Sequence, residues 1–492
     1  MTETAKKKRG MPSSFTILLA LLAIVAVVTV IVSGTSGGAV TAARLSDFCT
    51  APIKGFADAL PVCLFVMILG GFLGMMTETG ALDNGIAVLV QKLKGNEIML
   101  IPVLMLIFSL GGTTYGMCEE TVPFYALLAA TMMAAGFDPM VGAATVLLGA
   151  GCGCLGSTVN PFAVGAAVDA LTGVDIAVNQ SIIIGLGAVL WLVTTVMSIV
   201  FVMNYAKKVK ADKGSTILSM QELKDAEEAH GKAASEVHKE VKLTGRQKGV
   251  LIAFAFTFVV MIVGFIPLAD LNEGVANFFD AGAVYDADGN AVVQGWSALI
   301  TGLPIGQWYF DEASTWFFLM AILIGIIGGL SEKQIVNTFI TGAADMMSVV
   351  LVIALARGIS VLMASTGLDV FVLDAAAKAL SGLSGVIFAP MSFLVYFGLS
   401  FLIPSTSGMA TVSMPIMGPL AVKLGFSPEV MVMIFSAAIG VVNLFTPTSG
   451  AIMGGLALAK IEWTTWLKFA LKLIVALSVV CAIILTVACV LL

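Results

Sequence analysis

The chain has 492 residues, of which 59% are hydrophobic and only 11% are charged, whereas soluble domains carry about 25% charged residues. A protein of this size could not bury so much apolar surface in water, so the composition excludes a soluble fold and predicts a chain that lies mostly in lipid. The net charge of −6 is small, and we expect no nucleic-acid partner.

Seven cysteines lie mostly within apolar runs without paired metal-ligand spacing, and both histidines, His230 and His238, lie in one polar segment. We therefore expect no metal site and no cofactor. The sequence has no Gly-x-x-x-x-Gly-Lys-Ser/Thr loop, so an ATP-driven pump is not expected. A membrane-embedded enzyme is another class to consider, and the lack of histidine in the apolar runs argues against it.

Residues 1–12 are polar and include four successive basic residues ahead of an apolar run at about 13–32. The run is long enough to span a bilayer and shows no clear cleavage site, so we expect a retained helix with its N terminus in the cytoplasm. Residues 34–58 have mixed polarity and are expected outside, before a second span at about 60–76.

Two later apolar stretches of the first half are interrupted by small and polar residues. The stretch 98–135 breaks at Gly111–Pro123, and each limb is near or below the roughly 20 residues needed to cross a bilayer. A re-entrant hairpin and two crossings therefore both fit. The stretch 140–170 is interrupted before Pro161, which removes a backbone donor and predicts a helix broken within the membrane.

Residues 206–248 contain many lysines interleaved with acids and no apolar span, which is typical of a cytoplasmic linker. The linker divides the chain into a first repeat with its leading helix, 13–205, and a second repeat, 249–492. Between Lys248 and Lys333 there is no lysine or arginine, so the long acidic loop in this region is expected outside.

The second half repeats the pattern of the first. Thr79-Gly80-Ala81-Leu82-Asp83 recurs as Thr366-Gly367-Leu368-Asp369, a stretch at 384–424 breaks around 404–415, and another helix breaks at 446–450. The spans before the two motifs are expected to run in opposite directions. We therefore predict an all-α polytopic membrane protein with two inverted repeats, each with a re-entrant hairpin and a broken transmembrane helix.

The four breaks carry the candidate substrate-binding residues, because broken helices expose polar backbone groups that lipid would forbid. In the first repeat these are Thr113, Thr114, Gly116, Ser157, Thr158 and Asn160, and in the second they are Ser405, Thr406, Ser407, Thr446, Thr448 and Ser449. The alternative is that small hydroxylated residues simply pack and cap membrane helices.

Charged residues within the apolar stretches are the sharpest candidates. Glu119 and Glu120 lie at bilayer depth, where a charge costs about 3 kcal/mol, and would serve as a counter-charge for a cationic substrate group or as a proton acceptor. The alternative is local: with Gly116 as N-cap, Glu119 would satisfy a helix start. Arg357 either binds a substrate carboxylate or pairs with an acid such as Glu119 or Asp345, and pairing is favoured because buried charges in membranes are usually neutralised.

These motifs resemble the YfcC-like branch of the C4-dicarboxylate anaerobic carrier family, in the ion transporter superfamily. The resemblance covers nearly the whole chain and is carried by the basic segment before Met11-Pro12, Thr79–Asp83, Gly116-Met117-Cys118-Glu119-Glu120, Asn160-Pro161-Phe162, Ala356-Arg357-Gly358-Ile359 and Ser405-Thr406-Ser407-Gly408.

The resemblance implies a homodimeric carrier with a scaffold and a transport domain that moves its substrate by an elevator motion. Members of the wider superfamily carry dicarboxylates with sodium through a Ser-Asn-Thr tip in each hairpin. Here the tips read Thr113-Thr114-Tyr115-Gly116 and Ser405-Thr406-Ser407-Gly408, so that motif is absent. Related carriers are described as basic amino-acid antiporters, and the acidic pair suits a cationic substrate better than a dianion.

We therefore expect a bacterial inner-membrane secondary active transporter rather than an enzyme, with the lipid bilayer and a small molecule as its partners. The favoured activity is exchange of basic amino acids of the arginine/ornithine type. The alternative is a C4-dicarboxylate uptake or exchange carrier coupled to Na+ or H+, in which Arg357 and hydroxyl groups hold both carboxylates. A channel is a further alternative.

Overall fold

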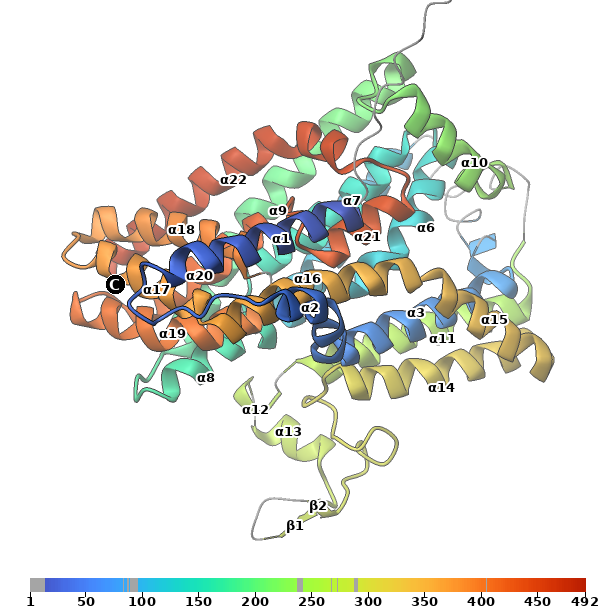
Figure 1. Cartoon of the computed structure of the whole chain (residues 1–492). Coiled ribbons are helices and arrows are strands. Elements are labelled where there is room, and N and C mark those ends of the chain that lie inside the picture. Colours follow the sequence, from blue (N-terminus) through green and yellow to red (C-terminus); the bar gives the residue numbers. More distant parts are fainter. Residues whose placement is uncertain are drawn as a thin grey trace, which may run out of the picture.

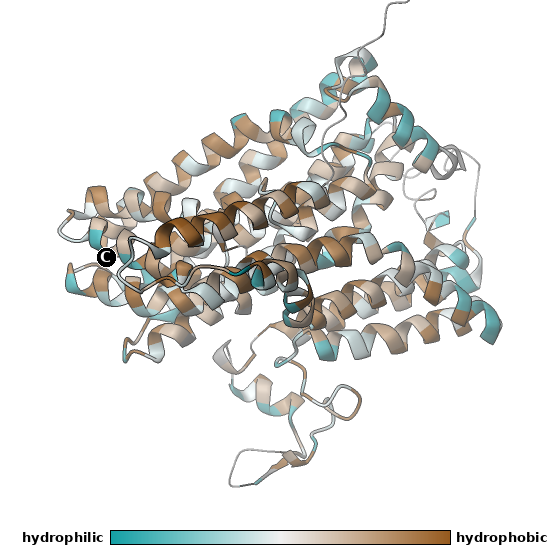
Figure 2. Ribbon diagram, in the orientation of Figure 1, coloured by the Kyte–Doolittle hydropathy of each residue, from teal (hydrophilic) through white to brown (hydrophobic). Residues whose placement is uncertain are grey.

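The computed structural model describes residues 14–492 except 83, 86–87, 89–95, 237–241, 267, 272, 287–290 and 404. The expected cytoplasmic N terminus (1–12), Asp83 of the repeated motif and His238 lie outside the described residues. The described part is almost wholly helical, and eight of its helices are long and apolar enough to cross a membrane. Figure 2 shows apolar residues along the helix shafts and hydrophilic ones gathered on α10 and at helix ends.

The first half and the linker form the following elements: α1 (Ser14–Ser33), α2 (Leu45–Asp58), α3 (Leu60–Glu78), η1 (Glu97–Met99), α5 (Leu100–Tyr115), η2 (Glu119–Thr121), α6 (Val122–Ala134), α7 (Pro139–Leu155), the π-helical turn η3 (Pro161–Gly165), α8 (Ala166–Thr172), α9 (Gln180–Ala211), η4 (Lys213–Ser215) and α10 (Met220–Glu236). Figure 1 places α10 at one end of the helices and the C terminus at the other.

The second half comprises α11 (Gly245–Phe265), α12 (Leu268–Leu271), α13 (Glu273–Phe279), β1 (Val284–Tyr285), β2 (Ala291–Val293), α14 (Phe310–Gly328), α15 (Glu332–Asp345), α16 (Met347–Thr366), α17 (Leu368–Leu380), α18 (Gly385–Leu402), α19 (Thr406–Lys423), α20 (Pro428–Val442), α21 (Gly450–Leu458) and α22 (Trp463–Leu491). The two short strands form an antiparallel pair in the loop between α11 and α14, which projects to one side of the helices in Figure 1.

The first hairpin, α5 and α6, is re-entrant. Glu97, just before α5, forms a salt bridge with Lys210, with Oε2 and Nζ 2.7 Å apart. The same Lys210 Nζ lies 5.0 Å from the ring centroid of Phe137, just after α6. Both ends of the hairpin therefore lie beside the linker end of α9. Helix α6 has 13 residues, about 20 Å at 1.5 Å per residue, which is too short to cross a hydrocarbon core of about 30 Å.

The second hairpin, α18 and α19, enters from the opposite end of the molecule. Phe388, at the start of α18, stacks on Phe426, which follows α19, with ring centroids 4.8 Å apart. These residues lie near the C-terminal end of α22. The N-terminal end of α22 lies at the linker, because the Glu462 N–H donates to Glu222 at 2.9 Å. The two hairpins thus point toward each other from opposite ends, as expected for inverted repeats.

Two groups of closely packed helices position the site. In the crossed-helix group, α2 packs on α16, α3 packs on α15 and α14, and α11 packs on α14. In the hairpin group, α5 and α6 pack on α7, α18 and α19 pack on α20, and α7 packs on α20. Close approach within the crossed-helix group requires glycine at α2–α16, where a Cβ on Gly55 would collide with the Gly358 backbone.

Two helices of the crossed-helix group were not expected from the sequence. Residues 45–58, part of the segment 34–58 that was expected outside, form α2 and pack against α16. Residues 332–345, for which no span was expected, form α15. Both are amphipathic and less apolar than the neighbouring spans, because only one face of each helix packs against protein.

Candidate functional site

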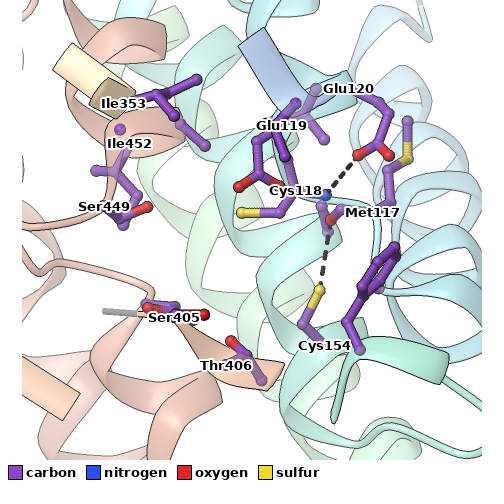
Figure 3. Close-up of a pocket in the computed structure, with 18 of the residues that line it drawn as sticks. Met117, Cys118, Glu119, Glu120, Cys154, Ile353, Ser405, Thr406, Ser449 and Ile452 are labelled. Carbon is purple, nitrogen blue, oxygen red and sulfur yellow. Dashed lines mark hydrogen bonds between the residues drawn. The ribbon is translucent and has the colours of Figure 1, made fainter. Parts of the chain in front are cut away.

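A cavity of about 310 Å³ lies between the crossed-helix group and the hairpin group, within the usual size range of small-molecule sites. One wall is formed by the junction of α2 and α3, the start of α14 and the middle of α16, and the other by both hairpin tips and both broken helices. Figure 3 shows Ser405, Thr406 and Ser449 on one side of this space and Met117–Glu120 on the other. The fold therefore gathers the breaks of both repeats at one place.

The first hairpin tip is shaped by a left-handed glycine. Gly116 has φ 81° and ends α5, with its N–H donating to Gly112 O at 3.1 Å and the Met117 N–H donating to Gly111 O at 3.4 Å. This is the usual glycine cap of a helix C terminus. A Cβ on Gly116 would lie 2.5 Å from Asn160 Oδ1, so the tip also needs glycine for contact with the first broken helix.

The two glutamates at this tip have different surroundings. Glu120 is 1% exposed, and its carboxylate accepts a hydrogen bond from the Cys118 N–H at 3.0 Å. Glu119 is less buried, and its carboxylate points into the cavity in Figure 3. The Cys118 N–H at the start of η2 is thus satisfied by Glu120 rather than by Glu119.

The first broken helix presents Asn160 at the cavity. Its Oδ1 accepts from the N–H groups of Phe162 and Ala163 at 2.9 and 3.3 Å, and its Nδ2 donates to Ser157 Oγ at 2.9 Å. Asn160 therefore caps the second segment of the helix and holds the break in one conformation.

The hydroxyl groups around the first break are engaged within the protein. Thr113 Oγ1 donates to Gly156 O at 2.7 Å, Thr158 Oγ1 donates to Thr113 O at 3.0 Å, and Thr114 Oγ1 donates to Leu110 O at 2.6 Å. The first two hydrogen bonds tie the hairpin to the broken helix, and the third lies within α5. For these threonines the capping and packing alternative therefore describes the structure.

The second repeat brings two helix N termini to the cavity. Ser405 caps α19, with its Oγ accepting from the Gly408 N–H at 3.1 Å, and Thr406 and Ser407 form the first helical turn. Ser449 precedes α21 without a capping hydrogen bond from its side chain. Because helix N termini carry free N–H groups and partial positive charge, this wall favours an anionic group.

The crossed-helix wall carries an ion pair. Arg357 Nε on α16 lies 2.8 Å from Asp58 Oδ2 at the end of α2, and both residues line the cavity. Pairing was expected for Arg357, but with Glu119 or Asp345. Arg357 instead contacts Asp58.

Most of the candidate residues line the cavity. Those that do are Gly116, Glu119, Glu120, Asn160, Ser405, Thr406, Ser407, Thr448, Ser449 and Arg357. Thr113, Thr114, Ser157, Thr158 and Thr446 are not among the lining residues and lie behind these positions, with Thr446 Oγ1 bonded to Thr448 Oγ1 at 2.7 Å.

Several lining residues were missed. Asp58, Cys118, Ser436 and Asn443 were not singled out from the sequence. Asn443 directly follows α20, so an amide at the end of an apolar run could have marked it. Ser436 is 1% exposed, and its hydroxyl has no hydrogen-bond partner among the described residues.

Two proteins of known sequence are similar to this chain over most of its length. A protein from Haemophilus influenzae without a described function is 29% identical over 445 residues, covering 90% of this chain and 78% of its own. The Escherichia coli protein named "Putative basic amino acid antiporter YfcC" is 27% identical over 440 residues, covering 87% and 77%.

Two solved transporter structures are similar to the whole chain at low identity. The Neisseria gonorrhoeae protein MtrF, described in a study of antimetabolite efflux pumps, has a TM-score of 0.45 and 17% identity and covers 98% of this chain and 96% of its own. The YdaH transporter of Alcanivorax borkumensis has a TM-score of 0.45 and 15% identity, with 97% and 98% covered.

The family model described as "C4-dicarboxylate anaerobic carrier" matches residues 41–490, nearly the whole described chain. The chain is therefore a multi-pass membrane transporter that belongs to the C4-dicarboxylate anaerobic carrier family.

Proposed function

We propose that this protein is an elevator-type secondary carrier of the bacterial inner membrane that exchanges basic amino acids of the arginine/ornithine type. The observation that carries the proposal is the placement of Glu119, whose carboxylate faces the cavity while Glu120 is held by the Cys118 N–H. A cationic side chain entering the cavity would meet Glu119 directly.

The charges of the lining residues support a cationic ligand. The carboxylates that line the cavity belong to Asp58, Glu119 and Glu120, and the guanidinium belongs to Arg357. With these groups ionised, acids outnumber bases, and a dianion would add to the repulsion. The name of the Escherichia coli relative agrees with this choice.

The polar N-terminal ends of the second repeat complement Glu119. The first turn of α19, at Ser405–Ser407, and the start of α21, at Ser449, offer N–H groups and hydroxyls for a carboxylate. The hairpin tips and broken helices would hold the α-carboxylate and α-amino group, and Glu119 would hold the side-chain cation.

An elevator motion is supported by the position of the cavity at the boundary between the two packing groups. The crossed-helix group would be the scaffold and the hairpin group would be the transport domain. At this boundary α21, which packs on α6 of the hairpin group, also packs on α16, with Gly450 close to Ile353 and Gly454 close to Val349. The lysine-rich linker favours a cytoplasmic position for the end of the molecule at which α10 lies. We also propose a homodimer, on the basis of the family resemblance.

A C4-dicarboxylate carrier coupled to Na+ or H+ is the second candidate. Arg357 and the helix N termini at Ser405 and Ser449 would bind the two carboxylates, and the description of the family favours this substrate. It leaves Glu119 facing a dianion, which is the reason we place it second.

Counterflow in proteoliposomes separates the candidates. Vesicles loaded with unlabelled arginine should accumulate labelled arginine, with one-for-one exchange and no conductance in bilayer recordings. Accumulation of labelled succinate against internal succinate, with no arginine counterflow, would instead identify the dicarboxylate carrier, and a steady ionic current would identify a channel.

A further inference from the structure

The ion pair on the scaffold wall is not used by the proposed function. Arg357 and Asp58 come from α16 and α2, which cross tightly at Gly55 and Gly358. Both side chains line the cavity, and 26% of the Arg357 side chain and 53% of the Asp58 side chain remain exposed. Both charged groups therefore remain accessible to a ligand in the cavity.

The contact between the two side chains leaves capacity for a ligand. It joins Nε of the guanidinium to one oxygen of the carboxylate, while a guanidinium has five N–H donors and a carboxylate has about four acceptor positions. A second carboxylate can therefore bind Arg357, and an ammonium group can bind Asp58, without displacing helix α2 or α16.

The chemistry of an exposed pair selects the class of ligand. A molecule with one carboxylate and one ammonium group can engage both partners at once. A dicarboxylate would engage Arg357 and meet a like charge at Asp58, and a simple amine would engage Asp58 and meet a like charge at Arg357.

We propose that Asp58 and Arg357 form a receptor for the zwitterionic head group of an α-amino acid, with its carboxylate on Arg357 and its ammonium group on Asp58. The proposal rests on the proposed function for the choice of a basic amino acid. It extends that function by placing the head group between the scaffold wall and the helix N termini at Ser405 and Ser449. The substrate then bridges the scaffold and the transport domain in the arrangement observed, with its side chain at Glu119.

Three ligands and three variants test the receptor. The ligands are arginine, its decarboxylated analogue agmatine and its deaminated analogue 5-guanidinopentanoate, with Kd measured on the purified full-length protein in lipid nanodiscs. Arg357→Gln should weaken arginine and 5-guanidinopentanoate relative to agmatine by about tenfold or more, because a charge-assisted hydrogen-bonded pair is lost. Asp58→Asn should weaken arginine and agmatine relative to 5-guanidinopentanoate by a similar factor.

The double variant Asp58→Asn with Arg357→Gln is the matched control, because it keeps the net charge of the cavity. If the single-variant effects come from direct contacts, the double variant binds arginine weakly and no longer distinguishes it from either analogue. If they come from net charge alone, the double variant recovers wild-type affinity, and the proposal is wrong. Equal weakening of all three ligands by a single variant would also overturn it.

Failure of the proposed function gives a different result. A wild-type protein that binds succinate and no α-amino acid would overturn both proposals. A wild-type protein that binds another α-amino acid, found by thermal shift, would overturn only the choice of a basic one. The Kd values of the same variants are then measured with that amino acid and with its decarboxylated and deaminated analogues. The ratios of these Kd values test the receptor in the same way.

Discussion

The two hairpin tips occupy equivalent places in the inverted repeats, and their chemistry differs. The first tip turns through left-handed Gly116 and brings the carboxylate of Glu119 to the cavity. The second tip is the start of a helix, capped by Ser405, and brings hydroxyls and backbone N–H groups. An inverted duplication can therefore keep its symmetry in the backbone while making one side of a cavity acidic and the other side attractive to anions.

The contrast between neighbouring glutamates gives the largest expected effect. Glu119→Gln should weaken arginine binding by about 30-fold or more, near 2 kcal/mol, because it removes the charge that faces the ligand. Glu120→Gln should change affinity by less than about threefold, since a glutamine oxygen can still accept from the Cys118 N–H. Equal losses in the two variants, measured by radioligand binding, would remove the distinction between the two acids.

The next largest effect concerns the backbone, because the first tip has a left-handed glycine and the second tip begins a helix. Gly116→Ala should destabilise the protein by about 1–2 kcal/mol or more, because alanine is strained in the left-handed region and its Cβ would meet Asn160. Gly398→Ala is the matched control, since this glycine lies within α18 of the second hairpin and a Cβ there would meet nothing within 4 Å. Thermal unfolding in detergent should show a clear decrease for the first variant and little change for the second. A larger decrease for Gly398→Ala would contradict the requirement for a left-handed glycine at the first tip.

The sequence was sufficient to locate the breaks. Glycine, proline and runs of hydroxylated residues interrupt apolar stretches, and such interruptions are tolerated in membranes only where protein or a cavity satisfies the backbone. For this reason Gly116, Asn160, Ser405 and Ser449 could be placed at the site from their neighbours in the chain. The inverted duplication also predicted that these residues of the two repeats would lie close together in the fold.

The sequence could not show which side chains at a break remain available to a ligand. Thr113, Thr158 and Ser449 are all hydroxylated residues at a break. The Thr113 hydroxyl, however, donates a hydrogen bond to the first broken helix, and the Thr158 hydroxyl donates one to the hairpin. Asp58 gave no signal, because it reaches the cavity through the crossing of α2 with α16 at Gly55. Such roles depend on contacts between distant segments, which residue patterns along one segment do not contain.

The caps of the second repeat give a smaller effect. Ser405→Ala should cost about 1 kcal/mol of stability, because its Oγ accepts the Gly408 N–H at the start of α19. Ser449→Ala should cost less, since the Ser449 side chain makes no capping hydrogen bond. Both variants should weaken carboxylate binding to a similar extent if both hydroxyls face the ligand. Chemical denaturation, with substrate affinity measured on the same samples, tests whether stability and binding separate in this way.

The smallest expected effect concerns the linker helix α10, which packs on α6 of the first hairpin. His230 is 8% exposed and its Nε2 lies 3.1 Å from Leu458 O at the end of α21. Burial lowers the pKa of His230 below its usual value, the hydrogen bond with Leu458 O offsets part of this shift, and nearby Lys460 lowers the pKa further. The released helix therefore binds more protons than the docked helix below the usual histidine pKa of about 6.5.

Docking of α10 should consequently be complete above about pH 6.5 and weaken as the pH falls below that value. Hydrogen exchange of the α10 amides, corrected for the intrinsic pH dependence and compared with α19 in the same sample, should show faster opening at pH 5.5 than at pH 7.5. His230→Gln should remove this difference, because a glutamine amide can still reach Leu458 O but does not titrate. Exchange that accelerates equally in α10 and α19, or that keeps its pH dependence in the variant, would show that α10 is not held by a titrating contact at His230.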